Sequence, residues 1–297
     1  MNKLISWFPT EVDRKVRVMA WVTFVVQTLI VVTGGAVRLT ASGLGCPTWP
    51  KCTADSFVTT PEMGVHGIIE FGNRLLTFVL VIVAIITFAL ILRMRKQRKD
   101  LFRLTLWIGL GIPAQAVIGG ISVLTQLDPY IVGLHFVVSI GLVILSTMLV
   151  FRVYRGNSPR TWAVAPALIW VLWLMALSQL TTITIGILTT GSGPHAGDAD
   201  APRNDLNSWL LQELHSYSAY LAVGLAALGL VMALRSSHGA LAKSLVVLLT
   251  VNISQIIVGL LQATNGLPPL LVGIHMLLAC LVTAAVTLSL LNLRKNL

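Results

Sequence analysis

Charged side chains are scarce in this sequence. Asp, Glu, Lys and Arg together make up 11% of its 297 residues, whereas soluble domains carry roughly 25%. The mean hydropathy is correspondingly high, at +0.85. These values exclude an ordinary soluble domain and indicate a membrane protein.

Cysteine is also rare, and its spacing excludes a common class of metal site. The cysteines are Cys46, Cys52 and Cys280, and none of them has the close spacing to histidine or carboxylate that zinc sites use. Cys46 and Cys52 share a short loop that we expect outside the membrane, where oxidation is permitted, so we predict a disulfide between them. Cys280 lies within the last apolar run and is predicted to be a packing residue.

Long apolar runs, by contrast, are abundant. A helix that crosses a bilayer needs roughly 20 apolar residues, and eight runs satisfy this length. The first run already has spanning length and lacks a convincing cleavage site, so we expect no removable signal peptide. We predict an all-α membrane protein with eight transmembrane spans at about 18–37, 66–92, 104–126, 130–151, 162–189, 208–234, 241–263 and 268–292.

The excess of basic residues follows the membrane topology. If the amino terminus is cytoplasmic, 17 of the 21 Lys and Arg residues fall in inner segments, and outer segments hold eight of the eleven acids. This is the positive-inside pattern, and it predicts that both termini are cytoplasmic. The net charge of +10 is thereby explained without nucleic acid as a partner.

An internal repeat organises the chain. Residues 115–135, QAVIGGISVLTQLDPYIVGLH, return without gaps at 255–275 as QIIVGLLQATNGLPPLLVGIH. Each copy predicts an apolar helix, a turn, and a second helix that starts at proline and carries a histidine about two turns in. We therefore predict two four-helix bundles, residues 1–156 and 157–297. Because four is an even number, the halves should be parallel repeats related by an axis along the membrane normal.

Four of the six histidines lie near the outer ends of the even-numbered spans: His66, His135, His215 and His275. Ionisable groups inside membrane helices are costly and are functional by default. Histidines on two facing helices can hold a cofactor in a four-helix bundle, and a pair of neutral imidazoles can ligate haem iron. The alternative is that each histidine only hydrogen-bonds a neighbouring helix. The repeated placement favours axial ligands of haem iron.

The motif GGAVRLTASGLGCPTWPKC, followed by IIEFGNR, resembles the haem A synthases, membrane enzymes that oxidise haem O to haem A for terminal oxidases. The resemblance covers essentially the whole chain. It implies a haem b between His215 and His275, and a substrate haem O in the amino-terminal half with His135 as a ligand and Glu70 as the catalytic residue. The methyl group at ring carbon 8 would become a formyl group through successive hydroxylations.

The same resemblance implies partners and a location. Haem O synthase would supply the substrate, and a quinone or another electron-transfer partner would take the electrons. We expect a multi-pass protein of the cell membrane, in contact with lipid, with its haem sites toward the extracytoplasmic side. A homo-oligomer is a further candidate arrangement.

One position departs from the family pattern. The family places a histidine three residues after the glutamate and directly before an arginine, where this chain has Asn73 before Arg74. His66 stands instead four residues before Glu70, on the same helix face but roughly 10 Å nearer the outer surface than Asn73. Either His66 ligates the iron of a shifted haem, which we favour slightly, or His135 alone holds the substrate haem.

Glu70 and two outer arginines admit competing roles. Glu70 could take a proton or stabilise positive charge on the oxidised methyl carbon, or it could merely offset the helix dipole and pair with Arg74. Arg38 and Arg74 each present a fork that suits the propionates of a haem. Lipid phosphate would suit these two arginines about as well.

Two other functions compete with the haem-oxidising enzyme. A bis-histidine b-type cytochrome would pass electrons to quinone and make no product, but it needs no carboxylate on the histidine face, where Glu70 lies. A transporter with parallel repeats would place its polar groups at the membrane midplane, whereas here they gather at the outer ends. We therefore favour the enzyme, with Glu70 as the discriminating residue.

Overall fold

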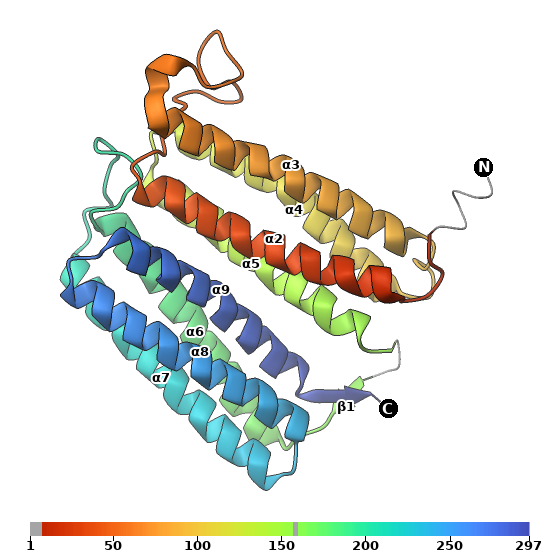
Figure 1. The fold of residues 1–297 in the computed structure, drawn as a ribbon. Coiled ribbons are helices and arrows are strands. Elements are labelled where there is room, and N and C mark those ends of the chain that lie inside the picture. Colours follow the sequence, from red (N-terminus) through yellow and green to blue (C-terminus); the bar gives the residue numbers. More distant parts are fainter. Residues whose placement is uncertain (1–7, 157–159, 297) are drawn as a thin grey trace.

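A computed structural model describes residues 8–156 and 160–296 (Figure 1). Eight helices in this part of the chain are long and apolar enough to cross a membrane. This confirms the predicted all-helical chain with eight spans. The helices are α2 (Arg14–Leu39), α3 (Gly64–Leu92), α4 (Lys99–Leu124), α5 (Pro129–Val153), α6 (Pro166–Ser192), α7 (Ser208–Arg235), α8 (Gly239–Thr264) and α9 (Pro269–Leu291), with a short 3₁₀ turn, η1 (Pro61–Met63), before α3.

Local sequence determines where several helices begin. Asp13 caps α2 by accepting a hydrogen bond from the Val16 N–H at 3.0 Å, and Asn207 caps α7 in the same way. Asp128 caps α5, where Pro129 occupies the first turn. Short polar side chains satisfy the free N–H groups at a helix start, and proline lacks the N–H that would go unpaired there.

A small sheet corrects one predicted boundary. The apolar pattern predicts a fifth span from residue 162, but α6 begins at Pro166. Arg160–Trp162 instead form strand β1, which pairs antiparallel with β2 (Arg294–Asn296) beyond the end of α9. Backbone groups used in this pairing cannot also extend a helix. The predicted boundary between the halves lies between residues 156 and 157, and residues 157–159 lie outside the described residues.

The helices gather in two sets of four. Figure 1 shows α2–α5 on one side and α6–α9 on the other, with α2, α5 and α9 meeting along the centre. α2 and α9 approach closely at Gly35, where an added Cβ would lie 2.7 Å from the Met276 side chain. Gly133 of α5 lies equally close to Ile187 of α6. Small residues allow membrane helices to pack their backbones closely in this way.

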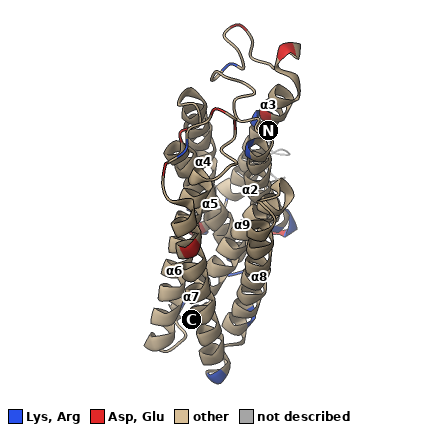
Figure 2. Cartoon of the chain, turned by 90° about the vertical axis from the view of Figure 1, so that its left-hand side faces the viewer, with Lys and Arg blue, Asp and Glu red and all other residues tan. Residues whose placement is uncertain are grey.

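Charged and apolar residues are distributed unevenly along the long axis of the molecule. Figure 2 shows Lys, Arg, Asp and Glu mostly toward the helix ends and loops, with long stretches of helix carrying none. Two apolar clusters fill the end at which α2 begins and α5 ends, and the polar residues predicted to form sites lie toward the opposite end. Fully buried members are Leu90, Ile91, Met94, Leu101 and Leu149 in one cluster, and Leu168, Leu172, Leu241, Leu245 and Leu248 in the other.

A buried pair of hydroxyls between α2 and α3 allows the packing to be tested. Oγ1 of Thr23 and Oγ1 of Thr87 lie 3.0 Å apart and share a hydrogen bond. In a double-mutant cycle with valine at both positions, we expect a coupling energy of about 0.6 kcal/mol, which is typical of hydrogen bonds between membrane helices. Unfolding of the purified protein in mixed detergent measures this energy. A coupling of zero would show that the pair does not join the two helices.

Candidate functional site

The two copies of the repeat place their histidines in the same way. His135 of α5 lies against Gly119 of α4, and His275 of α9 lies against Gly259 of α8. A Cβ added to either glycine would stand 3.2 Å from Cε1 of the facing ring. Because these glycines carry no side chain, each imidazole ring rests directly against the backbone of the neighbouring helix.

The second half brings two imidazole rings together. His215 of α7 lies against Gly186 of α6, where a Cβ would stand 2.8 Å from the ring. The ring centres of His215 and His275 are 6.2 Å apart, and the ring planes are inclined by 56°. Both side chains are half-buried between helices. The two residues predicted to act as a pair therefore face each other.

Hydrogen bonds orient the ring of His215. Its Nδ1 lies 2.8 Å from the carbonyl oxygen of Thr182, and a carbonyl only accepts, so Nδ1 carries the proton. The lone pair is then on Nε2, where it can bind a metal ion. The Thr182 hydroxyl donates to the Ser218 hydroxyl, which donates to the His215 carbonyl, each over 2.9 Å. This chain of bonds links α6 and α7 around the ring.

Buried polar atoms recur without a partner at the same positions of the repeat. Among the described residues, Nδ1 of His135 and of His275 and the side-chain oxygens of Gln115 and Gln255 make no hydrogen bond. Leaving a buried polar group unpaired costs about 1–3 kcal/mol. The two copies of the repeat therefore share these unpaired buried atoms.

The histidine pair of the second half fits a haem iron. A metal ion that lies about 2 Å from one nitrogen of each of two imidazoles separates their ring centres by about 6 Å, and the rings of His215 and His275 are 6.2 Å apart. Neutral histidine is a common axial ligand of haem iron. The helices that carry the rings are apolar enough to span a membrane. Their side chains would give the faces of a porphyrin the apolar surroundings that they need.

In the first half, Asn73 and not His66 occupies the place of His215. Asn73 lies against Gly34 of α2, with its Nδ2 4.0 Å from a Cβ placed there, as His215 lies against Gly186. Its Oδ1 is buried and has no hydrogen-bond partner among the described residues. The family pattern marks the position of Asn73 as that of a histidine, and the structure places Asn73 there, whereas the sequence alone slightly favoured His66 as the ligand.

His66 belongs to the outer loop region. Its side chain is exposed, and its Nδ1 lies 2.9 Å from the hydroxyl of Ser42. The His66 backbone packs against Gly45, where any Cβ would overlap the His66 carbonyl. Ligation of iron by the remaining ring nitrogen of His66 stays a prediction.

Glu70 and Arg74 form a polar centre at the outer end of the first half. Glu70 is 6% exposed, and its carboxylate accepts a 2.6 Å bond from Arg74 and a bond from the Cys46 backbone N–H. Arg74 also donates to the carbonyls of Cys46, Thr48 and Lys51 at 3.0 to 3.2 Å. The ion pair weighed as a structural role for Glu70 is therefore present, and the Arg74 guanidinium is fully engaged by this chain.

The same loop carries the disulfide. Cys46 and Cys52 are bonded, with their Cα atoms 4.4 Å apart, which confirms the predicted bridge. Trp49, between them, lies against Gly120 of α4, where a Cβ would overlap its ring. Gly120 follows the glycine that faces His135, so the loop contacts α4 one residue away from the position that supports this histidine. Nothing in the sequence pattern predicted the contact of Trp49.

Arg38 lies where the two halves meet. Its Nη2 donates to the carbonyl of Thr190, near the end of α6, over 3.1 Å. In the loop after α6, burial and then the charges of Arg38 and Arg203 lower the pKa of His195 below its usual 6.5. Positive charge thus accumulates at this outer junction, and arginine there suits a carboxylate ligand.

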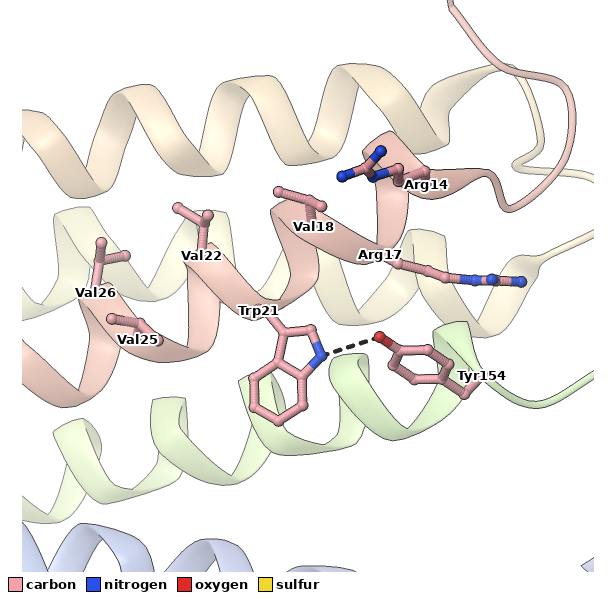
Figure 3. Close-up of a pocket in the computed structure, with 8 residues that line it drawn as sticks. All are labelled: Arg14, Arg17, Val18, Trp21, Val22, Val25, Val26 and Tyr154. Atoms are coloured by element: carbon pink, nitrogen blue, oxygen red, sulfur yellow. Dashed lines mark hydrogen bonds between the residues drawn. The ribbon is translucent and has the colours of Figure 1, made fainter.

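A separate groove of about 460 Å³ lies at the opposite end of α2. Figure 3 shows its lining, in which the Trp21 indole donates to the Tyr154 hydroxyl over 3.1 Å. Arg17 lies over the Tyr154 ring, 5.5 Å from its centre. Trp, Tyr and Arg beside valines are typical of a helix end at a membrane surface. The groove contains none of the predicted site residues, and its chemistry suits lipid.

Together the fold and the site define an eight-helix membrane protein with repeated histidines set against glycines in positions suited to haem. The chain belongs to the COX15-CtaA family of cytochrome oxidase assembly proteins, whose profile matches residues 17–287. It is 34% identical over 161 residues to the heme A synthase of Lysinibacillus sphaericus, covering 52% of this chain and 47% of that protein. It is 30% identical over 150 residues to that of Bacillus pumilus, covering 48% and 47%. The chain thus aligns with about half the length of these curated relatives.

Removing the Arg74 side chain tests whether it holds the disulfide loop. Arg74→Ala leaves the Glu70 carboxylate buried without its cation, which costs about 3–5 kcal/mol, and it frees three loop carbonyls. We expect trypsin to cut after Lys51 about tenfold faster or more, because local opening governs cleavage. Reduced gels measure the rate. Arg235→Ala, at the inner end, is the control. Equal cleavage rates in the wild type and both variants would show that Arg74 does not hold the disulfide loop.

Proposed function

We propose that this protein is a haem A synthase, which oxidises the C8 methyl group of haem O to a formyl group and so provides haem A for terminal oxidases. The observation that carries the proposal is a pair of related sites. His275 faces His215 across 6.2 Å in one half, and His135 repeats the setting of His275 in the other. One site then suits a resident haem and the other a substrate haem. The family and the names of the relatives support this function.

The carboxyl-terminal half would hold a haem b between His215 and His275. When bound, this group supplies one-electron redox chemistry. The chain's own contribution is orientation: the Thr182 carbonyl keeps Nε2 of His215 free for the iron. Gly186 and Gly259 let both rings lie close to their helix backbones, which fixes the separation of the two rings.

The amino-terminal half would bind haem O as its substrate, with His135 as an iron ligand. Of the two arginines predicted to bind propionates, Arg38 is the better placed, because all three nitrogens of Arg74 already donate within the chain. The disulfide loop packs Trp49 against Gly120 and would shield this half from the outer solvent. Exclusion of water strengthens the electrostatic interactions inside a site.

Glu70 would assist the oxidation of the methyl group. With water as the oxygen source, CH₃ and H₂O give CHO, four protons and four electrons, and the electrons leave to an acceptor such as a quinone. A carboxylate near the reacting carbon can take a proton or stabilise positive charge. The bonds from Arg74 and the Cys46 N–H hold the Glu70 carboxylate in one orientation. Such preorganisation is what electrostatic catalysis requires.

We further propose a cell-membrane location with both termini in the cytoplasm and both haem sites toward the extracytoplasmic side. The start of α2, the turn after α3 and the strands β1 and β2 lie at one end of the molecule (Figure 1), and these segments are rich in Lys and Arg. The two four-helix sets would be parallel repeats related by an axis along the membrane normal. Proposed partners are haem O synthase, a quinone or other electron acceptor, lipid at the Trp21 groove, and a second copy of this chain.

Replacing either ligand tests the haem b site. His215→Ala and His275→Ala should each abolish the low-spin b-type absorbance of the purified protein, because a single imidazole leaves the iron short of one axial ligand. Insertion into the membrane should be unaffected. His238→Ala, at the inner end, is the matched control and should keep the wild-type spectrum. Full, unshifted absorbance in both ligand variants would refute the assignment.

Glu70→Gln tests catalysis, because it removes the charge and keeps the size. Product formation should fall by about 10²-fold or more, the scale of losing a positioned acid–base group, while haem content stays nearly intact. The measurement is the ratio of haem O, hydroxylated haem and haem A extracted from cells that express each variant. Glu62→Gln, an exposed acid outside the site, serves as the control. A wild-type ratio from Glu70→Gln would remove Glu70 from the mechanism and favour a cytochrome without catalysis.

A further inference from the structure

We propose that the haem site of the first half has a single histidine ligand, His135, and an open coordination position beside Asn73. That position would accept a small ligand such as carbon monoxide or cyanide. The inference rests on the haem binding proposed above. It assigns His66 to the outer loop and not to the iron, the opposite of the interpretation that the sequence alone favoured.

Depth along the helices identifies Asn73 as the counterpart of His215. Asn73 stands 19 residues before Leu92, the end of α3, and His215 stands 20 residues before Arg235, the end of α7. His66 stands 26 residues before Leu92. At about 1.5 Å per residue, His66 is therefore offset from Asn73 by roughly 10 Å along the helix axis. An imidazole side chain is too short to bridge that offset.

The contacts between helices agree with the depths. Gly34 and Gly186 are equivalent positions, since each follows a buried glutamine by seven residues. The side chain that lies against Gly186 is His215, and the side chain that lies against Gly34 is Asn73. Both sets of helices are thus built to present one residue at this place. In the second half it is an imidazole, and in the first half it is an amide.

The residue on the other side of the site is unchanged between the halves. His135 and His275 contact their glycines at the same two distances, 3.2 Å from Cε1 and 3.6 Å from Nδ1 to the added Cβ. A haem ligated by His135 would therefore present its opposite face to Asn73, as a haem ligated by His275 would present its opposite face to His215. The usual axial ligands of haem iron are His, Cys, Met and Tyr. A carboxamide is not among them, so that face stays open.

His66 is already engaged elsewhere. Its ring accepts or donates a 2.9 Å bond with the Ser42 hydroxyl, and Ser42 is fully buried. Its backbone contacts Gly45, where there is no space for a Cβ. Bringing the ring of His66 down to the iron would break these contacts with the segment that leads into the disulfide loop.

The Asn73 amide can act on a ligand at the open position. A carboxamide offers two N–H donors and one acceptor, and Oδ1 of Asn73 is buried without a hydrogen bond among the described residues. An amide in this place can donate to a small ligand on the iron without competing for the iron itself. An imidazole in this place would close the position.

Carbon monoxide binding to the reduced, purified, full-length protein tests the proposal. A haem with two histidine ligands resists CO, so the wild type should bind CO at one haem while the low-spin signal of the second half persists. Asn73→His should supply the second imidazole, abolish CO binding and increase the low-spin signal. His66→Ala is the matched control, and it should bind CO as the wild type does.

The opposite pattern would overturn the proposal. If the wild type binds no CO and His66→Ala gains CO binding, His66 is the second axial ligand. Should Asn73→His fail to fold, Asn73→Ala decides: it should keep CO binding and raise the C–O stretching frequency, because a hydrogen-bond donor is lost. An unchanged frequency would remove Asn73 from the site. Absence of the low-spin signal from the wild type would instead refute the haem function itself.

Discussion

An imidazole inside an apolar helix bundle must lie against something that tolerates it, and for three histidines of this protein that neighbour is a glycine. Gly119, Gly186 and Gly259 each receive a histidine from the following helix. This contact pairs α4 with α5, α6 with α7 and α8 with α9, and it places each ring at a similar depth. A polar ring is costly inside a membrane, and the contact with glycine holds each ring in a defined position from which it can act as a ligand.

The two halves share this plan and differ in what surrounds it. In the second half, His215 and His275 face each other and hydrogen bonds from α6 fix one of them. In the first half Asn73 lies against Gly34, the equivalent of Gly186, and the Glu70–Arg74 pair holds the disulfide loop at the outer end. A site with two strong ligands suits a group that stays. With the ligands proposed here, the first-half site would have one strong ligand and would suit a group that enters, reacts and leaves.

Much of the fold follows from simple rules. The thickness of the bilayer dictates spans of about 20 residues, so the apolar runs predicted all eight helices. The pairing of His215 with His275 was implied by the resemblance to the haem A synthases. The disulfide followed from the short spacing between Cys46 and Cys52. The start of α6 could not be predicted from the local pattern, because the pairing of Arg160–Trp162 with a distant strand is a long-range contact.

The rest of the site could not be predicted, for identifiable physical reasons. Arg74 binds the backbone carbonyls of Thr48 and Lys51. Every residue has such a carbonyl, so the residue types do not show which ones accept a hydrogen bond. Asn73 and His66 share a helix face, so periodicity alone cannot choose between them. The choice needs the depth of each residue and its partner on the next helix, which here is Gly34 for Asn73 and Ser42 for His66.

We propose that one half keeps a resident haem and that the other half processes a different haem. The most direct test is to express the wild-type chain in cells that make haem O, purify it, and identify the extracted haems by mass. We expect haem B together with haem O or its oxidised products from the same protein. Haem B as the sole haem would contradict it and leave an electron-transfer cytochrome.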